Sequence, residues 1–241
     1  MKKGIVTLLL AAACIPLTSF DYAPHHYTAT VKGLPIPSNA EIISGLKQAL
    51  QQGTVKSSDQ LSALNGFFGN AAIKILMPPE AQKAEKTLRK LGMNKLCDNV
   101  ILSLNRAAED AAKQAKPIFV NAVKQMTVQD AANILTGSND AATQYFKRTT
   151  TAALSTQFKP VVHSSLSNVG ATNLYTQLAT QYNKIPFTFN KLNPDLDDYV
   201  TQKAIDGLFY QIALEELNIR QNLTARTTPV LQKVFGFLDK K

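Results

Sequence analysis

The chain has 241 residues, of which 45% are hydrophobic and 18% are charged, so it can bury a continuous core and is not a disordered tail. Eleven glycines and eleven prolines exclude a collagen-like or proline-rich repeat, and two cysteines exclude a disulfide scaffold or a four-cysteine zinc site. The formal net charge is +9, so the protein is basic.

Residues 1–13 have the three parts of an export signal. Lys2 and Lys3 supply positive charge, residues 5–13 form an apolar run interrupted only by Thr7, and the run ends in three alanines. The run is far shorter than the roughly 20 residues that cross a bilayer. We therefore expect a signal peptide over residues 1–13 and an exported domain, rather than a buried core helix at the N-terminus.

Cys14 follows the three alanines directly. This arrangement resembles the lipobox of bacterial lipoproteins, in which the cysteine thiol receives diacylglycerol, although Ala11 stands where that pattern prefers a leucine or another branched residue. Two expectations follow: lipidation of Cys14, which would anchor the protein to a membrane, or ordinary signal-peptidase cleavage nearby. In both cases the protein is periplasmic or held at a membrane outside the cytoplasm.

Residues 14–37 show no sustained hydrophobic period and contain Gly33, Pro35 and Pro37, which is typical of a flexible tether. His25 and His26 lie in this tether without a third ligand, so we expect no metal site there. The helical domain is predicted over residues 38–241.

The first predicted helix begins at Ser38, which has the spacing of a capping box with Glu41. We expect this helix to end near Gly53 and a second helix to begin at Ser57 or Ser58. The double proline at residues 78–79 then starts another helix that runs to Gly92.

The clearest helical period covers residues 94–116, where one face is apolar and narrows to alanines toward its end. Small residues allow close approach of a neighbour, so we expect this helix to be central in the bundle. Pro117 is expected to kink or break it. Cys97 lies beside its apolar stripe and is interpreted as a buried structural thiol.

Further helices are predicted along the rest of the chain. Thr127 starts a short helix that ends at Gly137, and another begins at residues 138–140. Pro160, Gly170 and Pro186 are expected to divide the following segment into shorter helices, and the last long helix begins near residues 193–195. No strand pattern of useful length occurs, so the predicted fold is all-α, a single compact multi-helix domain of roughly eight to ten helices.

The acidic residues contain no recognisable catalytic or metal motif. Asn193, Asp195 and Asp197 have the spacing of a calcium loop, but Asp198 and Ala204 replace its glycine and its bidentate glutamate. Helix-start carboxylates explain this cluster better. The paired acids at residues 109–110 and 215–216 are expected to be solvated surface charges. No hydrolase or metalloprotease motif surrounds the histidines, so catalytic residues stay unassigned, and we expect neither a cofactor nor a metal.

Asp140, Gln144 and Arg148 repeat every four residues along one helix. The ordinary interpretation is an ion-pair ladder on a solvated face, and the alternative is a binding face. The lysines are scattered and not interleaved with aromatic residues, so we expect no nucleic-acid partner. An anionic envelope surface is the expected electrostatic counterpart.

Several segments resemble, in the same order, exported bacterial proteins of domain-of-unknown-function family 4197. The resemblance covers roughly Ala40 to Gly236 and implies a helical, extracytoplasmic, single-domain protein, without an activity to carry over. The matching segments are residues 90–96 (KLGMNKL), 104–109 (LNRAAE), 115–119 (AKPIF), 126–131 (MTVQDA), 134–137 (ILTG), 140–146 (DAATQYF) and 195–200 (DLDDYV).

Two functional hypotheses follow from these patterns. The first is a non-enzymatic helical module that binds a protein partner or an amphipathic ligand at the cell envelope. The second is an enzyme of unfamiliar type acting on an envelope substrate through carboxylates from separate helices, such as Asp140 with Asp197 or Asp206. An apolar cavity with few polar groups would favour binding, and a cleft with two facing carboxylates would favour catalysis.

Overall fold

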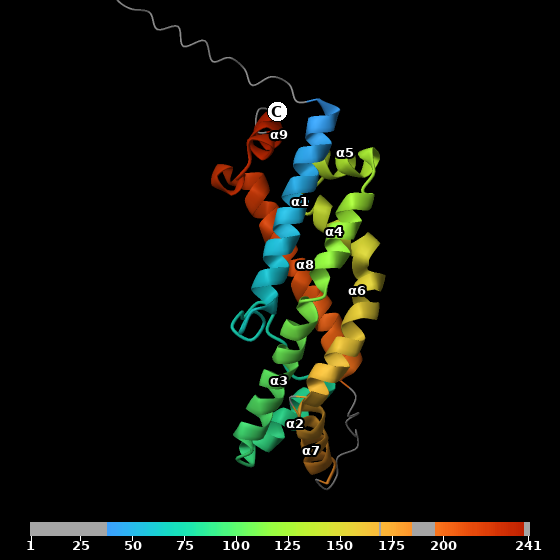
Figure 1. The fold of residues 1–241 in the computed structure, drawn as a ribbon. Coiled ribbons are helices and arrows are strands. Elements are labelled where there is room, and N and C mark those ends of the chain that lie inside the picture. The colour runs from blue at the N-terminus through green and yellow to red at the C-terminus, as the bar shows by residue number, and fades with distance from the viewer. Residues whose placement is uncertain (1–37, 169, 185–195, 239–241) are drawn as a thin grey trace, which may run out of the picture. The chain divides into compact units, whose positions relative to one another are not determined.

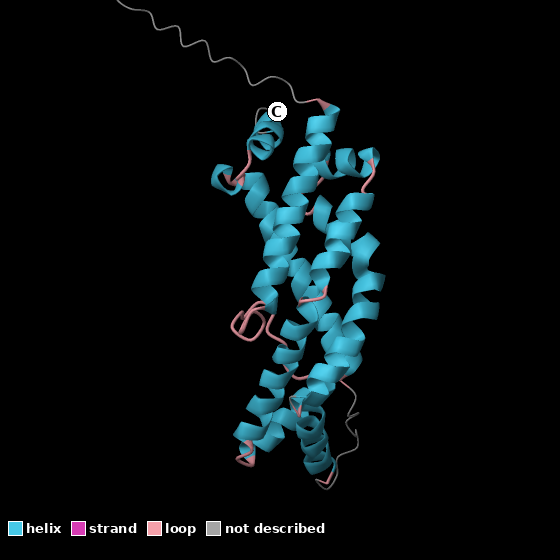
Figure 2. Ribbon diagram, viewed as in Figure 1, coloured by secondary structure: helices cyan, strands magenta, loops and turns pink. Residues whose placement is uncertain are grey.

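A computed structural model of the chain describes residues 38–168, 170–184 and 196–238 (Figure 1). All regular structure in these ranges is helical, and no strand occurs within them (Figure 2). The predicted all-α class is therefore confirmed. Residues 36–241 group into one compact unit. The expected signal peptide, Cys14 and the tether lie outside the described residues.

The described ranges contain nine α-helices and one short 3₁₀-helix. They are α1 (Asn39–Ser62), α2 (Pro79–Lys90), α3 (Asn94–Ala112), α4 (Ala115–Gln125), α5 (Val128–Thr136), α6 (Ala141–Asn168), α7 (Ala171–Asn183), α8 (Asp197–Gln221), η1 (Leu223–Ala225) and α9 (Pro229–Leu238). None of these helices is both long and apolar enough to span a lipid bilayer.

The start of α1 is as expected, but its end is not. Ser38 and Glu41 form the predicted capping box. The helix then continues past Gly53 and past the second start that we expected at Ser57 or Ser58. The hydroxyl of Ser58 donates to the carbonyl of Thr54 at 2.8 Å, so it bonds back into the helix instead of capping a new one. Gly53 is buried where α1 packs against α8 near Glu215, and this packing keeps the helix continuous.

The residues that begin and end α2, and the capping box that begins α5, are those that the sequence predicted. Pro79 occupies the first turn of α2, and Gly92 follows that helix with φ +82°. Thr127 and Asp130 form a capping box at the start of α5. The break after α3 comes at residues 113–114, and Pro117 lies in the first turn of α4, where a missing N–H costs nothing.

The structure corrects the prediction that Pro160 divides the segment of α6 into two helices. The helix runs unbroken from Ala141 to Asn168 with Pro160 inside it, and Gly170 immediately precedes α7. Pro186, the third expected break, lies outside the described residues. Leu154, Phe158 and Val162 are all buried on both sides of the proline. Because both halves pack against the core, their burial outweighs the one lost backbone hydrogen bond.

Helix α3 is central, as its alanine face predicted. It contacts α1, α2, α6, α7 and α8. Four buried alanines let these neighbours approach closely: Ala107, Ala108, Ala111 and Ala112. Helices α6 and α8 run antiparallel, since the start of α6 contacts Glu216 near the end of α8 and His163 contacts Asp197 at its start.

Candidate functional site

The predicted polar face on α6 is present at the surface. The Gln144 side chain donates to Asp140 at 2.8 Å, and hydrogen bonds from Gln144 and Ser138 hold the pKa of Asp140 below its ordinary value. Arg148 is paired elsewhere: its guanidinium lies 3.6 Å from Asp130 of α5 and over the Tyr145 ring. The three residues share an exposed face, and their proposed binding role stays a prediction.

The carboxylates that the enzymatic hypothesis paired are far apart. Asp197 lies 2.7 Å from Nδ1 of His163, which is 23 residues beyond Asp140 and therefore about 35 Å along α6. Asp206 lies nine residues into α8 from Asp197, and a glutamine side chain from Gln202 donates to it at 2.9 Å. The fold brings neither Asp197 nor Asp206 to Asp140.

Three glutamates that we expected at the solvated surface are buried, which corrects that prediction. Glu216 of α8 accepts hydrogen bonds from the backbone N–H groups of Ala142 and Thr143 at 2.9 and 2.8 Å, and it pairs with Arg220. It therefore caps the start of α6 from another helix. A carboxylate at a helix N-terminus satisfies free donors and opposes the positive end of the helix dipole.

The other two buried glutamates also have partners. Glu109 accepts from the N–H groups of Phe67 and Phe68, each at 3.2 Å, and pairs with Arg106. Glu215 pairs with Lys56 at 2.8 Å. These carboxylates hold the loop after α1 and the α1–α8 contact. Sequence reasoning missed the three glutamates because their partners are far away in the chain: the backbone partners of Glu109 and Glu216 lie about 40 to 75 residues away, and Lys56 is 159 residues from Glu215.

An extended segment between α1 and α2, residues 74–78, forms one wall of a groove. The buried side chain of Asn105 on α3 accepts from the N–H of Ile75 and donates to its carbonyl, both at 2.8 Å. The Asn105 amide thus pairs with both backbone groups of Ile75, as a neighbouring β-strand would do. Ile75 is thereby fixed to the central helix α3.

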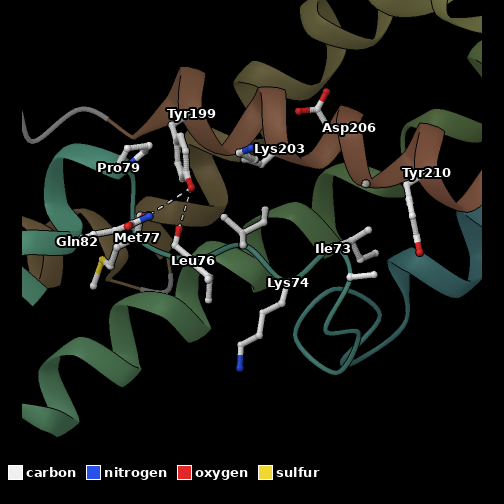
Figure 3. Close-up of a pocket in the computed structure, with 13 residues that line it drawn as sticks. Ile73, Lys74, Leu76, Met77, Pro79, Gln82, Tyr199, Lys203, Asp206 and Tyr210 are labelled. Carbon is white, nitrogen blue, oxygen red and sulfur yellow. Dashed lines mark hydrogen bonds between the residues drawn. The ribbon is translucent and has the colours of Figure 1, made fainter. Parts of the chain in front are cut away.

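The opposite edge of the segment faces α8. The Tyr199 hydroxyl donates to the carbonyl of Leu76 at 3.0 Å (Figure 3). Adjacent residues of an extended chain direct their N–H and C=O groups to opposite edges, so Leu76 faces away from Asn105. Within the described ranges, the N–H of Leu76 makes no hydrogen bond to another residue.

The groove between this segment and α8 has a volume of about 420 Å³ (Figure 3). Its α8 wall presents side chains of four residues, Tyr199, Lys203, Asp206 and Tyr210. Its apolar part includes Ile73, Leu76 and Tyr210, of which Leu76 is 52% and Tyr210 43% exposed. Asp206 is the single carboxylate in this lining. The sequence had no motif for the groove, because its walls come from segments more than 100 residues apart.

Burial fixes the protonation of the tyrosines near the groove. It raises the pKa of Tyr199 and, with the charge of Glu80, raises the pKa of the fully buried Tyr175 to about 12. Tyr199 therefore stays a hydrogen-bond donor to Leu76 at neutral pH. Cys97 is buried as expected, and burial raises the pKa of its thiol.

No group of three or more histidine, cysteine, aspartate or glutamate side chains suited to a metal ion occurs in the part of the chain that the structure describes. Asp197 and Asp198 lie in the first turn of α8, as the helix-start interpretation expected. Asn193 and Asp195, like His25 and His26, lie outside the described residues.

The comparison with known proteins adds one match. A family model described as "Protein of unknown function (DUF4197)" matches residues 36–236. No curated protein and no solved structure matches the chain.

Proposed function

Because this chain belongs to the DUF4197 family, whose description assigns no activity, we propose its function from its groove: it is a non-enzymatic module that binds an extended segment of a partner protein at the cell envelope. The observation that carries the proposal is the N–H of Leu76, which has no partner in the described ranges and lies on the edge where the Leu76 carbonyl accepts from Tyr199. The envelope location rests on the signal-like residues 1–13.

The composition of the groove supports binding over catalysis. The paired carboxylates that the enzymatic hypothesis requires do not occur in the groove, where Asp206 is the single carboxylate of the lining. The buried glutamates lie outside this lining, and backbone N–H groups and cations hold them in structural contacts. The lining also combines exposed apolar side chains with hydrogen-bonding groups, as a site for a peptide requires.

The backbone of the segment indicates the kind of partner. An extended peptide can add to an exposed strand edge, where main-chain hydrogen bonds provide affinity and side-chain pockets provide specificity. Here the Leu76 N–H is the donor on that edge, and the side chains of Leu76 and Tyr210 supply apolar contact. Asn105 holds the segment in place before a partner arrives, which lowers the entropic cost of binding.

A random peptide library panned on the purified protein tests the proposal. We expect it to select peptides with alternating apolar residues, and we expect their affinity to depend on the Leu76 N–H. Leu76→Ala keeps this donor, whereas Leu76→Pro removes it, and a residue before proline favours the extended conformation that Ile75 already has. Relative to Leu76→Ala, Leu76→Pro should bind selected peptides about fivefold to tenfold more weakly by calorimetry.

Circular dichroism and unfolding midpoints of both variants establish that they are folded. Equal affinity of the two variants for the selected peptides would refute pairing at this edge. Failure of the library to enrich any peptide on the wild-type protein above the bare support would refute peptide binding in the groove. Turnover of an envelope substrate would favour the enzymatic hypothesis instead.

A further inference from the structure

A second surface lies at the hairpin formed by α2 and the start of α3. Lys83, Lys86 and Lys90 lie on the exposed face of α2, and Lys95 lies in the first turn of α3. All four are exposed. The spacing of the three α2 lysines places them on one side of the helix, so the hairpin carries a cluster of cationic side chains. We call these four lysines together with Leu91 the hairpin tip.

The nearby carboxylates do not neutralise this cluster. Arg89 forms ion pairs with Glu85 at 2.9 Å and with Asp98 at 2.7 Å, so a separate cation already engages these two acids. Glu80 lies in the first turn of α2, three residues before Lys83 and ten before Lys90, and it forms no ion pair with either lysine in the described ranges. In the described part of the chain, none of the four lysines has a carboxylate within ion-pair distance.

An apolar side chain is exposed at the end of the hairpin, beside Lys90 in the chain. Leu91 follows α2 directly and is 62% exposed, and Gly92 then turns the chain with φ +82° so that α3 runs back along α2. The turn therefore presents Leu91 at the end of the hairpin, between Lys90 and Lys95. Helix α7 packs against α2 and α3 at this end, and exposed Lys184 follows it (Figure 1).

We propose that the hairpin tip docks the protein onto an anionic lipid bilayer. The lysines are placed to contact lipid phosphates, and Leu91 is placed to enter the interface with the acyl chains. Basic residues around an apolar side chain are the combination that binds such surfaces, because electrostatic attraction and apolar burial then act together. The proposal uses other residues than the groove, and so it stands independently of the proposed function.

Features of the hairpin tip favour lipid over nucleic acid. Single-stranded nucleic acid is bound through aromatic stacking, and residues 79–98 contain no aromatic side chain. The one arginine in this range, Arg89, is occupied by its two ion pairs. The exposed Leu91 at the end of the hairpin also has no role in phosphate contacts, whereas a bilayer interface accommodates it.

The test uses the full chain with the substitution Leu91→Cys, whose thiol carries an environment-sensitive fluorophore. A second substitution, Cys14→Ser, prevents an acyl anchor from forming. Cys97 is buried and is not labelled under native conditions. We expect a blue shift and protection from an aqueous quencher with vesicles of equimolar phosphatidylglycerol and phosphatidylcholine, and neither change with phosphatidylcholine alone. The same fluorophore on Val128→Cys, which is 63% exposed on α5, should stay in water.

Two variants with the same net charge distinguish the effect of the lysines at the hairpin tip from the effect of the overall charge of the protein. One carries Gln at Lys83, Lys86, Lys90 and Lys95, and the other carries Gln at the exposed lysines Lys113, Lys116, Lys124 and Lys147. Each lysine near an anionic surface contributes about fivefold to binding, so the first variant should raise the lipid concentration for half-maximal shift by roughly twentyfold or more. The second should change it by less than about threefold.

Three results would overturn the proposal. They are an unshifted Leu91 probe on anionic vesicles at low salt, equal weakening of both quadruple variants, and an equal shift of the probes at residues 91 and 128. Binding of a single-stranded oligonucleotide by a protein whose Leu91 probe ignores vesicles would identify the tip as a nucleic-acid site instead. The probe reports its own surroundings, so a contribution of residues 1–13 to vesicle binding does not obscure the result.

Discussion

At the residue scale, several buried polar side chains complete backbone hydrogen bonds that the local chain leaves unmade. Glu216 caps the start of α6, and Asn105 holds Ile75. Arg226 is buried and donates to the carbonyls of Ile219 and Arg220 at 3.1 and 2.7 Å, at the C-terminal end of α8. Buried charges are costly unless they are paired, so each of these residues is tied to the tertiary structure around it.

Glu216→Ala should therefore be strongly destabilising. The substitution leaves two backbone donors and the Arg220 guanidinium without their acceptor in a buried site, and we expect a loss of about 3–5 kcal/mol in the free energy of unfolding. Glu85→Ala, which removes a partner of Arg89 nearer the surface, is the matched control and should cost about 1 kcal/mol or less. Urea denaturation measures both, and similar losses would contradict the capping role.

Alanine substitutions at two helical glycines, Gly207 and Gly53, should change the stability of the protein in opposite directions. A Cβ at Gly207 would lie 2.5 Å from the ring of fully buried Phe67, whereas a Cβ at Gly53 would make ordinary contacts at 3.8 and 3.9 Å. We expect Gly207→Ala to cost about 1–3 kcal/mol through overpacking and Gly53→Ala to add about 0.5–1 kcal/mol. Thermal unfolding followed by circular dichroism tests the pair, and a stabilised Gly207→Ala would show that Phe67 can move aside.

At the element scale, an ion pair joins the first and last helices of the described chain. Glu41 of α1 accepts from Lys233 of α9 at 2.6 Å and also completes the capping box with Ser38. The hydrogen bond from Lys233, followed by those from Ser38, lowers the pKa of Glu41 from 4.5 to about 2. The carboxylate thus stabilises the start of α1 and the position of α9 together.

This lowered pKa gives a pH dependence with a defined sign. A group whose pKa is lower in the folded state stabilises the protein above its ordinary pKa, and this contribution is lost as the pH falls through the folded value. The stability difference between wild type and Glu41→Gln should be constant above about pH 6 and shrink between about pH 5 and 2. Urea titrations at several pH values measure it, and a difference independent of pH would contradict the assignment.

The packing of whole helices explains why two helix boundaries were mispredicted. Proline and serine are local signals, and they marked breaks at Pro160 and at Ser57 or Ser58. The structure keeps both helices continuous because buried side chains on either side of each position pack against the same neighbours. Where the local signal coincided with a change of packing partner, as at Gly92 and Thr127, the prediction was correct.

At the scale of the whole molecule, the groove and the hairpin tip share no side chain, although Gln82 of the groove precedes Lys83 of the tip directly in α2. Leu91, the apolar residue of the tip, follows Gln82 by nine residues, which is about 13 Å along the helix. Effects at distant sites without common partners are usually additive. If both proposals hold, binding of an extended peptide and contact with an anionic surface are compatible with one another.

This separation predicts independent behaviour. Leu76→Pro should leave the vesicle-induced shift of the Leu91 probe unchanged, and the four glutamines at the hairpin tip should change the affinity for a groove-binding peptide by less than about twofold. Calorimetry with and without anionic vesicles checks both statements. A mutual effect of tenfold or more would show that the two surfaces are coupled.

The residues that the sequence analysis selected as a site show the limits of local patterns. Spacing identified Asp140, Gln144 and Arg148 as one face, and they do share it, but only the fold paired Arg148 with Asp130. No sequence motif marks the groove, because Asn105, Leu76 and Tyr199 are far apart in the chain and come together only in the tertiary structure. The three buried glutamates were mispredicted for the same reason.

By itself, the sequence determined the helical class, most helix starts and the central position of α3, because capping residues and hydrophobic periods act within a few residues of one another. The tertiary structure alone decided which carboxylates are buried, that α1 and α6 are continuous, and that an extended segment faces α8 across a groove. These features depend on contacts between residues far apart in the chain, whose energies outweigh local preference and leave no local trace in the sequence.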